Sequence, residues 1–296
     1  SSIRKNLGIS PKLNIRDKRA IGIGKLITLA NKDWKKILDE KQLHQWHKAL
    51  MQGNKYINAG KWRSSEEPMQ IVSGAIGRET IHYEAPPSST LTKEMSQFIH
   101  WYNETAPGGK KEINNPAIRS ALTHLYFESI HPYEDGNGRI GRVIAERAFH
   151  QTMQMKSTFS ISSILYKKQN EYYSNLQNAQ SKLDATSWIN YFSNIILEAI
   201  KSALKSIEFT IQKVNLFDQI ESLLNDRQMK VITKMTDEGL NWKGGMNAKK
   251  YMSITKTSKA TATRDLQDLV QKKVLTPLSA GGRSSSYEIN WNSSTL

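Results

Sequence analysis

The twelve residues 131–142, HPYEDGNGRIGR, contain an imidazole, two adjacent carboxylates, three glycines and two arginines. Gly136 and Gly138 allow backbone conformations in which successive N–H groups converge on an anion. Arg139 and Arg142 are three residues apart, so on a helix their guanidinium groups lie on one side, where they suit phosphate oxygens. The stretch therefore predicts a binding site for a phosphorylated ligand.

Two further side chains of this stretch could act on such a ligand. Asp135 offers a hard oxygen ligand for a Mg²⁺ ion that bridges phosphates. His131 has an unperturbed pKa of about 6.5, which suits proton removal at neutral pH, so it is the candidate general base. The alternative is an ordinary Asp/Gly turn with His131 as a helix cap. In that case Arg139 and Arg142 would repel each other at a helix start with no anion between them.

Two expected helices position the stretch. Asn115 can cap the segment NNPAIRSALTHLYFESI, and Pro116 fits its first helical position. The apolar residues on one face of this helix are Ile118, Leu122, Leu125 and Tyr126. Pro132 disfavours continuation of the helix, which places His131 at its end. A second helix is expected to begin near Asn137, because apolar residues then recur at helical spacing: Ile140, Val143, Ile144 and Ala148.

A β-hairpin is expected upstream of these helices. The segment MQIVSGAIGRETIHYEAPP holds two β-rich runs around a glycine-containing turn. Pro86 and Pro87 end the second run, because proline cannot donate to a strand ladder. The rest of the chain shows mostly helical patterning and no internal repeat, so the fold class is expected to be mainly α.

Composition bounds the class of protein. With 296 residues and 38% hydrophobic content the chain can bury a sizeable core, and two domains are expected. The absence of cysteine excludes disulfides, thiolate metal sites and a cysteine nucleophile. Apolar runs such as LITLA are far shorter than the roughly 20 residues that cross a bilayer. The sequence predicts a soluble, cytoplasmic protein with no membrane partner, and it leaves the oligomeric state open, a homo-oligomer included.

The chain is strongly basic, with 42 Lys and Arg against 27 Asp and Glu and a formal net charge of +15. Such a charge favours polyanionic partners, although it would also serve solubility alone. From Arg227 to Leu296 the chain has 12 basic and 5 acidic residues. This concentration indicates a separate C-terminal module.

The C-terminal module reads as a winged helix–turn–helix. Three helical segments, RQMKVITKM, NAKKYMSITKT and SKATATRDLQDLVQKK, precede a glycine-containing hairpin, VLTPLSAGGRSSSYEI. In the third helix the residues expected to face inward are Ala262, Leu266, Leu269 and Val270. The exposed residues expected to meet DNA phosphates and base edges are Lys259, Thr261, Thr263, Arg264 and Gln267. The alternative is a winged helix used for protein contacts or dimerisation.

The twelve-residue stretch resembles HPFx[D/E]GNGRxxR, the motif of the Fic-domain family, with Tyr133 where phenylalanine is usual. Other segments also resemble bacterial Fic proteins that carry a C-terminal winged helix: SSIRKNLGIS, MQIVSGAIGRETIHYEAPP, LTHLYFESIHPYEDGNGRIGR and EYYSNL. The resemblance implies a Fic-type helical catalytic domain over 1–200 with a β-hairpin flap. It further implies a linker helix over 201–222 and a winged helix–turn–helix domain over 223–296.

The activity implied by the resemblance is transfer of AMP from ATP to a Ser, Thr or Tyr hydroxyl of a target protein, with Mg²⁺ bound by Asp135. His131 would take the hydroxyl proton and pyrophosphate would leave. The backbone of 136–138, with Asn137, would hold the α-phosphate, while the two motif arginines would orient the β- and γ-phosphates. The implied catalytic residues are His131, Asn137, Arg139 and Arg142. The implied nucleotide-binding residues of the motif are Asp135, Gly136, Asn137, Gly138, Arg139 and Arg142.

Two further elements acquire roles from the resemblance. In Fic proteins the hairpin is a flap that holds the target segment by strand-like main-chain pairing. Its tip here would be formed by Gly74, Ala75, Ile76, Gly77, Arg78, Glu79 and Thr80. The segment EYYSNL resembles the adenine side of the nucleotide site, with Tyr172, Tyr173 and Leu176 as the candidate contacts. Tyrosines in a helical pattern are, however, more often core residues.

One family element is absent from the sequence. Many Fic proteins carry an inhibitory helix, [S/T]xxxE[G/N], whose Glu pairs with the second motif arginine, here Arg142. The only Glu followed by Gly or Asn is Glu238, and Lys234 stands where Ser or Thr is required. In relatives the helix lies just upstream of the segment that resembles SSIRKNLGIS. We therefore expect the chain to be a fragment without the N-terminal inhibitory region.

Two classes of function remain open. The first is an adenylyltransferase that its winged helix localises or regulates. The second is a DNA-binding transcriptional regulator whose Fic core only senses nucleotide. His131 favours the enzyme, because a sensor needs no base. Within the enzyme class, transfer of another phosphate-containing group and removal of AMP also remain open.

Overall fold

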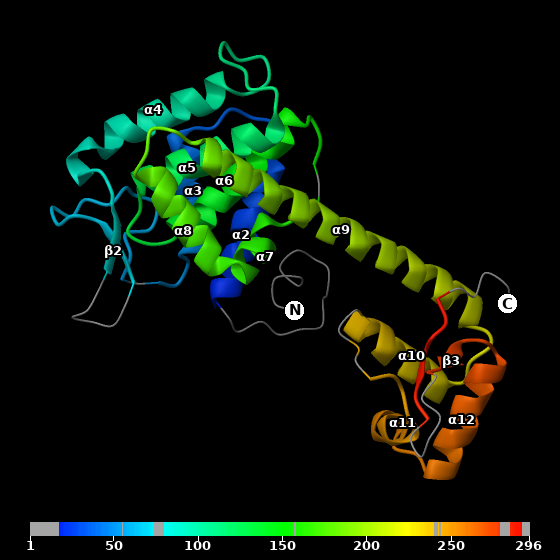
Figure 1. Cartoon of the computed structure of the whole chain (residues 1–296). Coiled ribbons are helices and arrows are strands. Elements are labelled where there is room, and N and C mark those ends of the chain that lie inside the picture. Colours follow the sequence, from blue (N-terminus) through cyan, green and yellow to red (C-terminus); the bar gives the residue numbers. More distant parts are fainter. Residues whose placement is uncertain are drawn as a thin grey trace. The chain divides into compact units, whose positions relative to one another are not determined.

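The computed structural model describes residues 18–54, 56–73, 80–156, 158–239, 242, 244–278 and 285–291. The described part is mainly helical (Figure 1). The chain divides into two compact units, Ser1–Ala203 and Leu204–Leu296. The division falls within one long helix, α9 (Thr186–Ile220). The predicted catalytic domain, 1–200, and the predicted module, 223–296, lie one in each unit.

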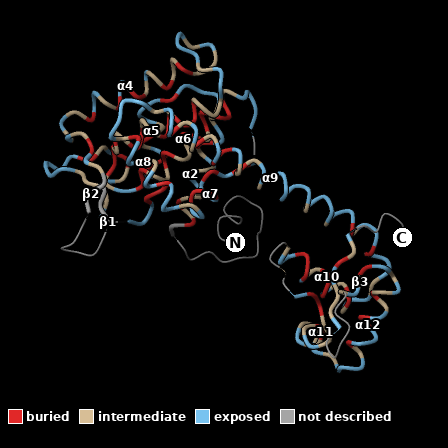
Figure 2. Tube along the Cα trace, viewed as in Figure 1, coloured by how far each residue is buried: buried red, intermediate tan, exposed pale blue. Residues whose placement is uncertain are grey.

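The first unit is built around two helices that pack closely against each other, α5 (Pro116–Ile130) and α6 (Asn137–Thr152). The other helices of the unit are α2 (Lys18–Lys32), α3 (Glu40–Leu50), η1 (Ser88–Thr90), α4 (Leu91–Glu104), α7 (Ile161–Lys167), α8 (Gln169–Gln180) and the first half of α9. Helix α4 contacts α5, α2 contacts α6, and α8 contacts α5. Figure 2 shows buried residues along both central helices. The crossing between α5 and α6 is thus held from several directions.

The two central helices begin where the sequence predicts. The Asn115 side chain accepts the N–H groups of Ala117 and Ile118, and Pro116 occupies the first helical position. An asparagine cap satisfies N–H groups that lack partners at a helix start, and proline has no N–H to satisfy there. The second helix begins at Asn137. Both boundaries were expected from capping chemistry and apolar spacing, and both are confirmed.

The apolar residues of the first unit form two clusters. One lies beneath α3, α4 and α6 and contains Trp46, Phe98, Tyr102, Phe127, Ile140 and Ile144. The other joins α7, α8 and α9 and contains Phe149, Ile161, Tyr172, Leu176, Trp188 and Phe192. Large aromatic side chains are buried in both clusters, where each contributes much apolar contact area to the packing around the central helices.

An antiparallel strand pair, β1 (Gln70–Ser73) and β2 (Thr80–Glu84), lies within the segment predicted to form a hairpin. Gln70 pairs with Glu84 and Ser73 with Thr80, and the register shifts between the two ends of β1. Of the expected flap tip, 74–79 lies outside the described residues, and Thr80 is the first residue of β2.

The second unit contains the end of α9, three helices and two strands. The helices are α10 (Asp226–Glu238), α11 (Ala248–Thr255) and α12 (Lys259–Gln271), and the strands are β3 (Leu275–Pro277) and β4 (Tyr287–Ile289). The two strands pair antiparallel. This order of three helices followed by a strand pair is the order that the sequence predicts for a winged helix–turn–helix.

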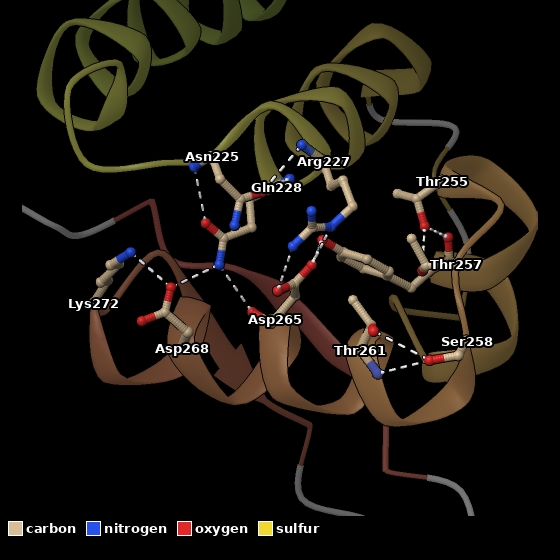
Figure 3. A network of polar contacts seen from close by, with 11 residues as sticks. Asn225, Arg227, Gln228, Thr255, Thr257, Ser258, Thr261, Asp265, Asp268 and Lys272 are labelled. Carbon is tan, nitrogen blue, oxygen red and sulfur yellow. Dashed lines mark hydrogen bonds and ion pairs between the residues drawn. The ribbon is translucent and has the colours of Figure 1, made fainter.

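A network of polar side chains fastens α12 to α10 and α11 (Figure 3). Asp265 accepts the Nε–H of Arg227 at 2.9 Å and the hydroxyl of Tyr251 at 2.9 Å. Gln228 donates to Asp268 at 2.7 Å, and Lys272 pairs with the same carboxylate at 2.6 Å. Both acidic side chains of α12 are therefore neutralised by partners within the unit.

None of the helices in the described ranges is both long and apolar enough to cross a membrane.

Candidate active site

Asn137 locks the loop between α5 and α6. Its side-chain oxygen accepts the N–H of Tyr133 at 2.9 Å, and its side-chain nitrogen donates to the carbonyl of Tyr133 at 2.7 Å. The side chain is only 2% exposed. Both polar atoms of the amide are thus used within the loop. Any contact of Asn137 with a phosphate would come from its backbone N–H.

Residues far away in the sequence hold the rest of the loop. His47 of α3 accepts the N–H of Gly60 at Nδ1, 2.7 Å away, so its Nε2 carries the proton donated to the carbonyl of Asp135 at 3.0 Å. The Tyr133 ring stacks on His47 with ring centres 3.9 Å apart. The Glu134 carboxylate accepts the N–H of Asn58 at 3.1 Å. The loop conformation is therefore fixed by at least three separate contacts.

His131 closes helix α5 in a left-handed backbone conformation, with φ 50° and ψ 59°. Its N–H donates to Phe127, and its carbonyl accepts the Nε–H of the buried Arg63 at 2.9 Å. Arg63 also reaches the carbonyl of Pro86, just beyond β2. The Tyr83 hydroxyl, on β2, donates to the carbonyl of Ser129 at 2.7 Å. These contacts tie the strand pair to the helix end that carries the candidate base.

The imidazole of His131 faces a buried carboxyl group. Nδ1 lies 3.7 Å from Oε2 of Glu128, one helical turn earlier. Neither Nδ1 of His131 nor Oε1 of Glu128 has a hydrogen-bond partner among the described residues. Burial lowers the pKa of His131 to about 4 and raises the pKa of Glu128 to about 7. Burial thus favours the neutral form of each group, as expected for ionisable side chains shielded from water.

The start of α6 presents free donors. Gly136 precedes it with φ 89°, and a Cβ at this position would lie 2.4 Å from the terminal methyl carbon of Met51. No side chain caps this helix. Within the described part of the chain, the backbone N–H groups of Asn137 and Gly138 have no acceptor. Such groups, with the positive end of the helix dipole, favour an anion.

The two motif arginines flank this helix start. Arg139 pairs with Asp135, its Nη2 lying 3.0 Å from each carboxylate oxygen. The Nε–H of Arg142 donates to the hydroxyl of Ser162 at 3.1 Å. Nη1 of Arg142 lies beside Gly138, 3.2 Å from the point where a Cβ would stand. Both guanidinium groups therefore lie within the first turns of α6.

The buried Glu128 and the partly buried Glu146 both lie close to Arg142. Burial raises the pKa of Glu146 to about 7, against the lowering effect of the Ile161 N–H and of Arg142. The same arginine acts on Glu128 across the helix pair. Gly141 permits this approach, because a Cβ there would lie 2.3 Å from Oε1 of Glu128. The close packing of α5 against α6 thus brings the carboxyl group, the imidazole and the arginine into one site.

The donor set can be tested against Mg²⁺. Within the described residues no group of three or more His, Cys, Asp or Glu side chains could enclose a metal ion. Asp135 is half exposed and offers a single carboxylate. Mg²⁺ commonly binds through one or two carboxylates together with substrate phosphates and water. Asp135 therefore fits a metal that arrives with a phosphorylated ligand, provided that its pairing with Arg139 loosens.

The adenine-side segment lies on α8, and its three candidate residues differ in exposure. Tyr172 is buried, and its hydroxyl contacts Nε2 of His124 at 3.0 Å. Leu176 is buried in the same apolar cluster. Tyr173 is 51% exposed. Of the three, only Tyr173 presents a ring that a base could stack on in this conformation.

The candidate DNA-binding residues share the outer side of α12. Lys259, Thr263, Arg264 and Gln267 are exposed, and Thr261 is half-buried. The residues expected to face inward are buried, apart from the partly buried Val270. Thr261 bonds to the capping Ser258, and the Thr263 hydroxyl donates to the carbonyl of Lys259 at 2.9 Å. Both threonines of this face are thus engaged in hydrogen bonds, whereas the side chains of Lys259, Arg264 and Gln267 have no such bond among the described residues.

The comparisons with known proteins agree with this geometry. Residues 37–149, which run from before α3 to near the end of α6 and include the whole loop, match the Fic/DOC family model. This segment is a Fic/DOC domain. A protein adenylyltransferase Fic of Nematostella vectensis is 28% identical over 123 residues, which are 42% of this chain and 24% of that protein. The match therefore spans about a quarter of the relative's length.

Solved structures share the fold of the Fic/DOC domain. A Fic family protein of Desulfovibrio desulfuricans G20 aligns with a TM-score of 0.56 and 20% identity over 97% of this chain and 80% of its own. A Fic domain containing signaling protein of Bacteroides thetaiotaomicron VPI-5482 aligns with a TM-score of 0.55 and 17% identity over 70% of this chain and 80% of its own. At these identities the likeness concerns the fold.

Several residues of the Fic/DOC domain site were not singled out from the sequence. Glu128 carries a signal, because it lies one helical turn before His131 and so shares its side of α5. The sequence pattern gives no such signal for Ser162 or Arg63. His47 and Asn58 are 88 and 76 residues away from their loop partners. Contacts over such separations leave no periodic pattern in a single sequence.

Proposed function

We propose that the chain is a protein adenylyltransferase, which transfers AMP from ATP to a Ser, Thr or Tyr hydroxyl of a target protein. The observation that carries the proposal is that His131, at the end of α5, and the open start of α6 with its two arginines lie at the two ends of one short loop. A base and an anion site on one rigid crossing are the two parts that phosphoryl-type transfer needs.

In the proposed reaction the target hydroxyl oxygen forms a bond to the α-phosphorus of ATP, and the bond from that phosphorus to the pyrophosphate oxygen breaks. His131 takes the hydroxyl proton. The N–H groups at the start of α6 hold the α-phosphate, while Arg139 and Arg142 receive the β- and γ-phosphates. Mg²⁺, when held by Asp135, would neutralise phosphate charge. Tyr173 is the candidate contact for the base.

Glu128 supports His131 in this proposal. Burial alone makes an imidazole a weak base, because its protonated form is poorly solvated. The Glu128 carboxylate, 3.7 Å from Nδ1, would hold the Nδ1–H tautomer and stabilise the imidazolium once the proton arrives. Nε2 would then face the hydroxyl. Glu128 is thus a positioning residue, which acts through His131.

The strand pair would hold the target. Its backbone is tied to the end of α5 through Tyr83 and Arg63, so a segment paired with a strand edge would pass beside His131. Main-chain pairing positions a hydroxyl with little demand on the target sequence. The proposed tip of this flap is 74–80, of which 74–79 lies outside the described residues.

The test of the proposal uses ATP labelled at either the α- or the γ-phosphate, with Mg²⁺ and a cell lysate or the protein itself as target. We expect label from the α-position only, attached to a protein hydroxyl. The His131→Ala variant should transfer no label. Label from the γ-position would indicate phosphate transfer instead. Binding of ATP with no label transfer from either position would favour a nucleotide sensor. The melting temperature of His131→Ala is compared with that of the wild type to check that the variant is folded.

We also propose that the second unit is a winged helix–turn–helix that binds DNA through α12. The exposed Lys259 and Arg264 support this, since the acidic side chains of the same helix are bonded inward. DNA affinity should fall steeply with salt concentration, and the slope should vanish when 227–296 is removed. A module used for protein contacts would show no such slope.

A further inference from the structure

Ser162, in the first turn of α7, contacts the second of the two motif arginines. Its hydroxyl oxygen accepts the Nε–H of Arg142 at 3.1 Å, and the residue is exposed. A hydroxyl group has one hydrogen to donate and two lone pairs with which it can accept. Among the described residues, no group accepts the hydroxyl hydrogen of Ser162. The serine therefore has a donor that is available to a ligand.

The guanidinium group of Arg142 lies between Gly138 and Ser162. On one side, its Nη1 is 3.2 Å from the point where a Cβ of Gly138 would stand. On the other side, its Nε is bonded to the serine. Arg139 is paired with Asp135, whereas Arg142 forms no ion pair within the described part of the chain. Arg142 therefore connects the open start of α6 to the first turn of α7 and keeps its charge available.

Helix α7 holds the backbone of Ser162 in place. The N–H of Ile161, the first residue of α7, donates to the Glu146 carboxyl group at 2.8 Å. Ile161, Ile164 and Leu165 are buried in the apolar cluster that joins α7, α8 and α9. The position of the serine is therefore fixed by the core of the first unit, although its side chain is exposed.

We propose that Ser162 binds the terminal phosphate of a nucleoside triphosphate and so contributes to the selection of triphosphates over shorter nucleotides. A phosphate chain whose inner end lies at the N–H groups that begin α6 would pass along Arg142 and end beside the serine. Ser162 would donate its hydrogen to a terminal phosphate oxygen, while its oxygen keeps the Nε–H of Arg142. This proposal rests on the proposed function, because it takes the α-phosphate to lie at the start of α6.

An alternative role for Ser162 predicts the opposite effect on affinity. The serine could occupy Arg142 only while the site is empty and give way when a phosphate arrives. Removal of the hydroxyl would then remove a competitor, and a triphosphate would bind equally well or more tightly. A direct contact instead predicts weaker binding, because a hydrogen bond to a charged oxygen is lost. The sign of the change separates the two roles.

The first test measures the binding of the full chain to three probes at one Mg²⁺ concentration. The probes are AMP, ADP and an ATP analogue with a carbon bridge between the α- and β-phosphorus atoms, which prevents release of pyrophosphate. Ser162→Ala should weaken binding of the analogue by about tenfold and binding of AMP by less than about twofold. Ser162→Thr keeps the hydroxyl group and should bind the analogue as the wild type does.

Ser163→Ala is the matched control. Ser163 lies in the same turn of α7 and is also exposed, but its hydroxyl donates to the carbonyl of Ser160 at 2.8 Å. It has no hydrogen bond with Arg142 in the described structure. This variant loses the same atom and should bind all three probes as the wild type does. The melting temperatures of both alanine variants check that each is folded.

A double-mutant cycle with Arg142→Ala tests whether the serine acts only through the arginine. In the Arg142→Ala chain, removal of the Ser162 hydroxyl should still weaken binding of the analogue by about threefold, because the direct contact with phosphate remains. If no further loss occurs in that chain, Ser162 only supports Arg142, and the contact with the terminal phosphate is refuted.

Failure of this inference and failure of the proposed function give different results. Unchanged or tighter binding of the analogue by Ser162→Ala would overturn the phosphate contact. Equal weakening for AMP and the analogue would also overturn it, because Ser162 would then affect the whole site. The expected binding pattern without label transfer from ATP in the wild type would support the contact and refute the proposed transfer. A wild type that binds none of the three probes would refute both.

Discussion

The motif loop of the first unit and helix α12 of the second both leave cationic side chains accessible to an anion, but their internal hydrogen bonds have different roles. In both, carboxylate and amide side chains are bonded within the protein, and cationic groups lie outside. In the loop, the internal bonds of Asn137 and Glu134 set the backbone itself, whose N–H groups are part of the site. In α12, the helix sets the backbone, and the bonds of Asp265 and Asp268 only remove negative charge. The loop should therefore be more sensitive to loss of an internal partner than the helix.

The largest effect is expected for Asn137→Ala. Both hydrogen bonds across the loop are lost, and the buried N–H of Tyr133 is left without an acceptor. The cost should be about 2–3 kcal/mol of unfolding free energy, measured by urea denaturation. Arg139→Ala is the control: its pair with Asp135 is partly exposed, so stability should change little while triphosphate binding weakens. Equal destabilisation by the two variants would contradict this division of roles.

The next effect concerns the support of the base. Glu128→Gln should lower kcat by about 10- to 100-fold and change KM for ATP much less, because the lost carboxylate supports His131 and is only a neighbour of Arg142. Wild-type activity should rise with pH through about 7, where Glu128 ionises, and this limb should be missing in the variant.

Glu146→Gln is the matched control for the Glu128 variant. This second glutamate is partly buried near Arg142, and burial of its carboxyl group raises its pKa to about 7 as well. It has no contact with His131 in the described structure. Its variant should keep the wild-type shape of the pH profile. A profile that is unaltered in Glu128→Gln would refute the positioning role.

A smaller effect is expected from a buried histidine. Burial lowers the pKa of His124 from its ordinary value of 6.5 to about 3. Between those values the unfolded chain binds a proton that the folded chain does not, so stability falls as the pH falls below about 6.5. This one group contributes about 1.4 kcal/mol per pH unit. His124→Phe, which keeps a ring against Phe192, should flatten the dependence between pH 5 and 6 by that amount, as measured by urea denaturation at each pH.

The smallest effect is expected on the surface of α12. Arg264→Ala should weaken DNA binding by less than about tenfold and lower the salt slope by about one. Arg227→Ala removes a cation from the same unit, but it strips Asp265 of its partner. That variant should lose stability and keep the salt slope. If Arg227→Ala changed the slope more than Arg264→Ala, the outer face of α12 would not be the DNA surface.

Local chemistry allowed much of the site to be predicted. The start of α5 at Asn115 and Pro116 and its end at His131 follow from capping and from the proline that comes next. The start of α6 follows from apolar spacing and glycine. Each of these depends on neighbours a few residues apart. The position of the candidate base and of the anion site could therefore be inferred from twelve residues.

What could not be predicted depends on packing between distant segments. Asn137 was expected to face phosphate, but its side chain satisfies the loop because a tight crossing has few other donors and acceptors. Tyr172 and Leu176 fill the core between α8 and α9, which a helical pattern of aromatic residues cannot distinguish from a nucleotide surface.

The left-handed turn at His131 has a consequence for how inactive variants behave. A residue with a side chain costs about 1 kcal/mol or more in that conformation, and glycine does not. His131→Gly should consequently melt higher than His131→Ala while both lack the imidazole. The chain thus keeps a histidine at the junction of its two central helices, in a backbone conformation that a glycine would adopt with less strain.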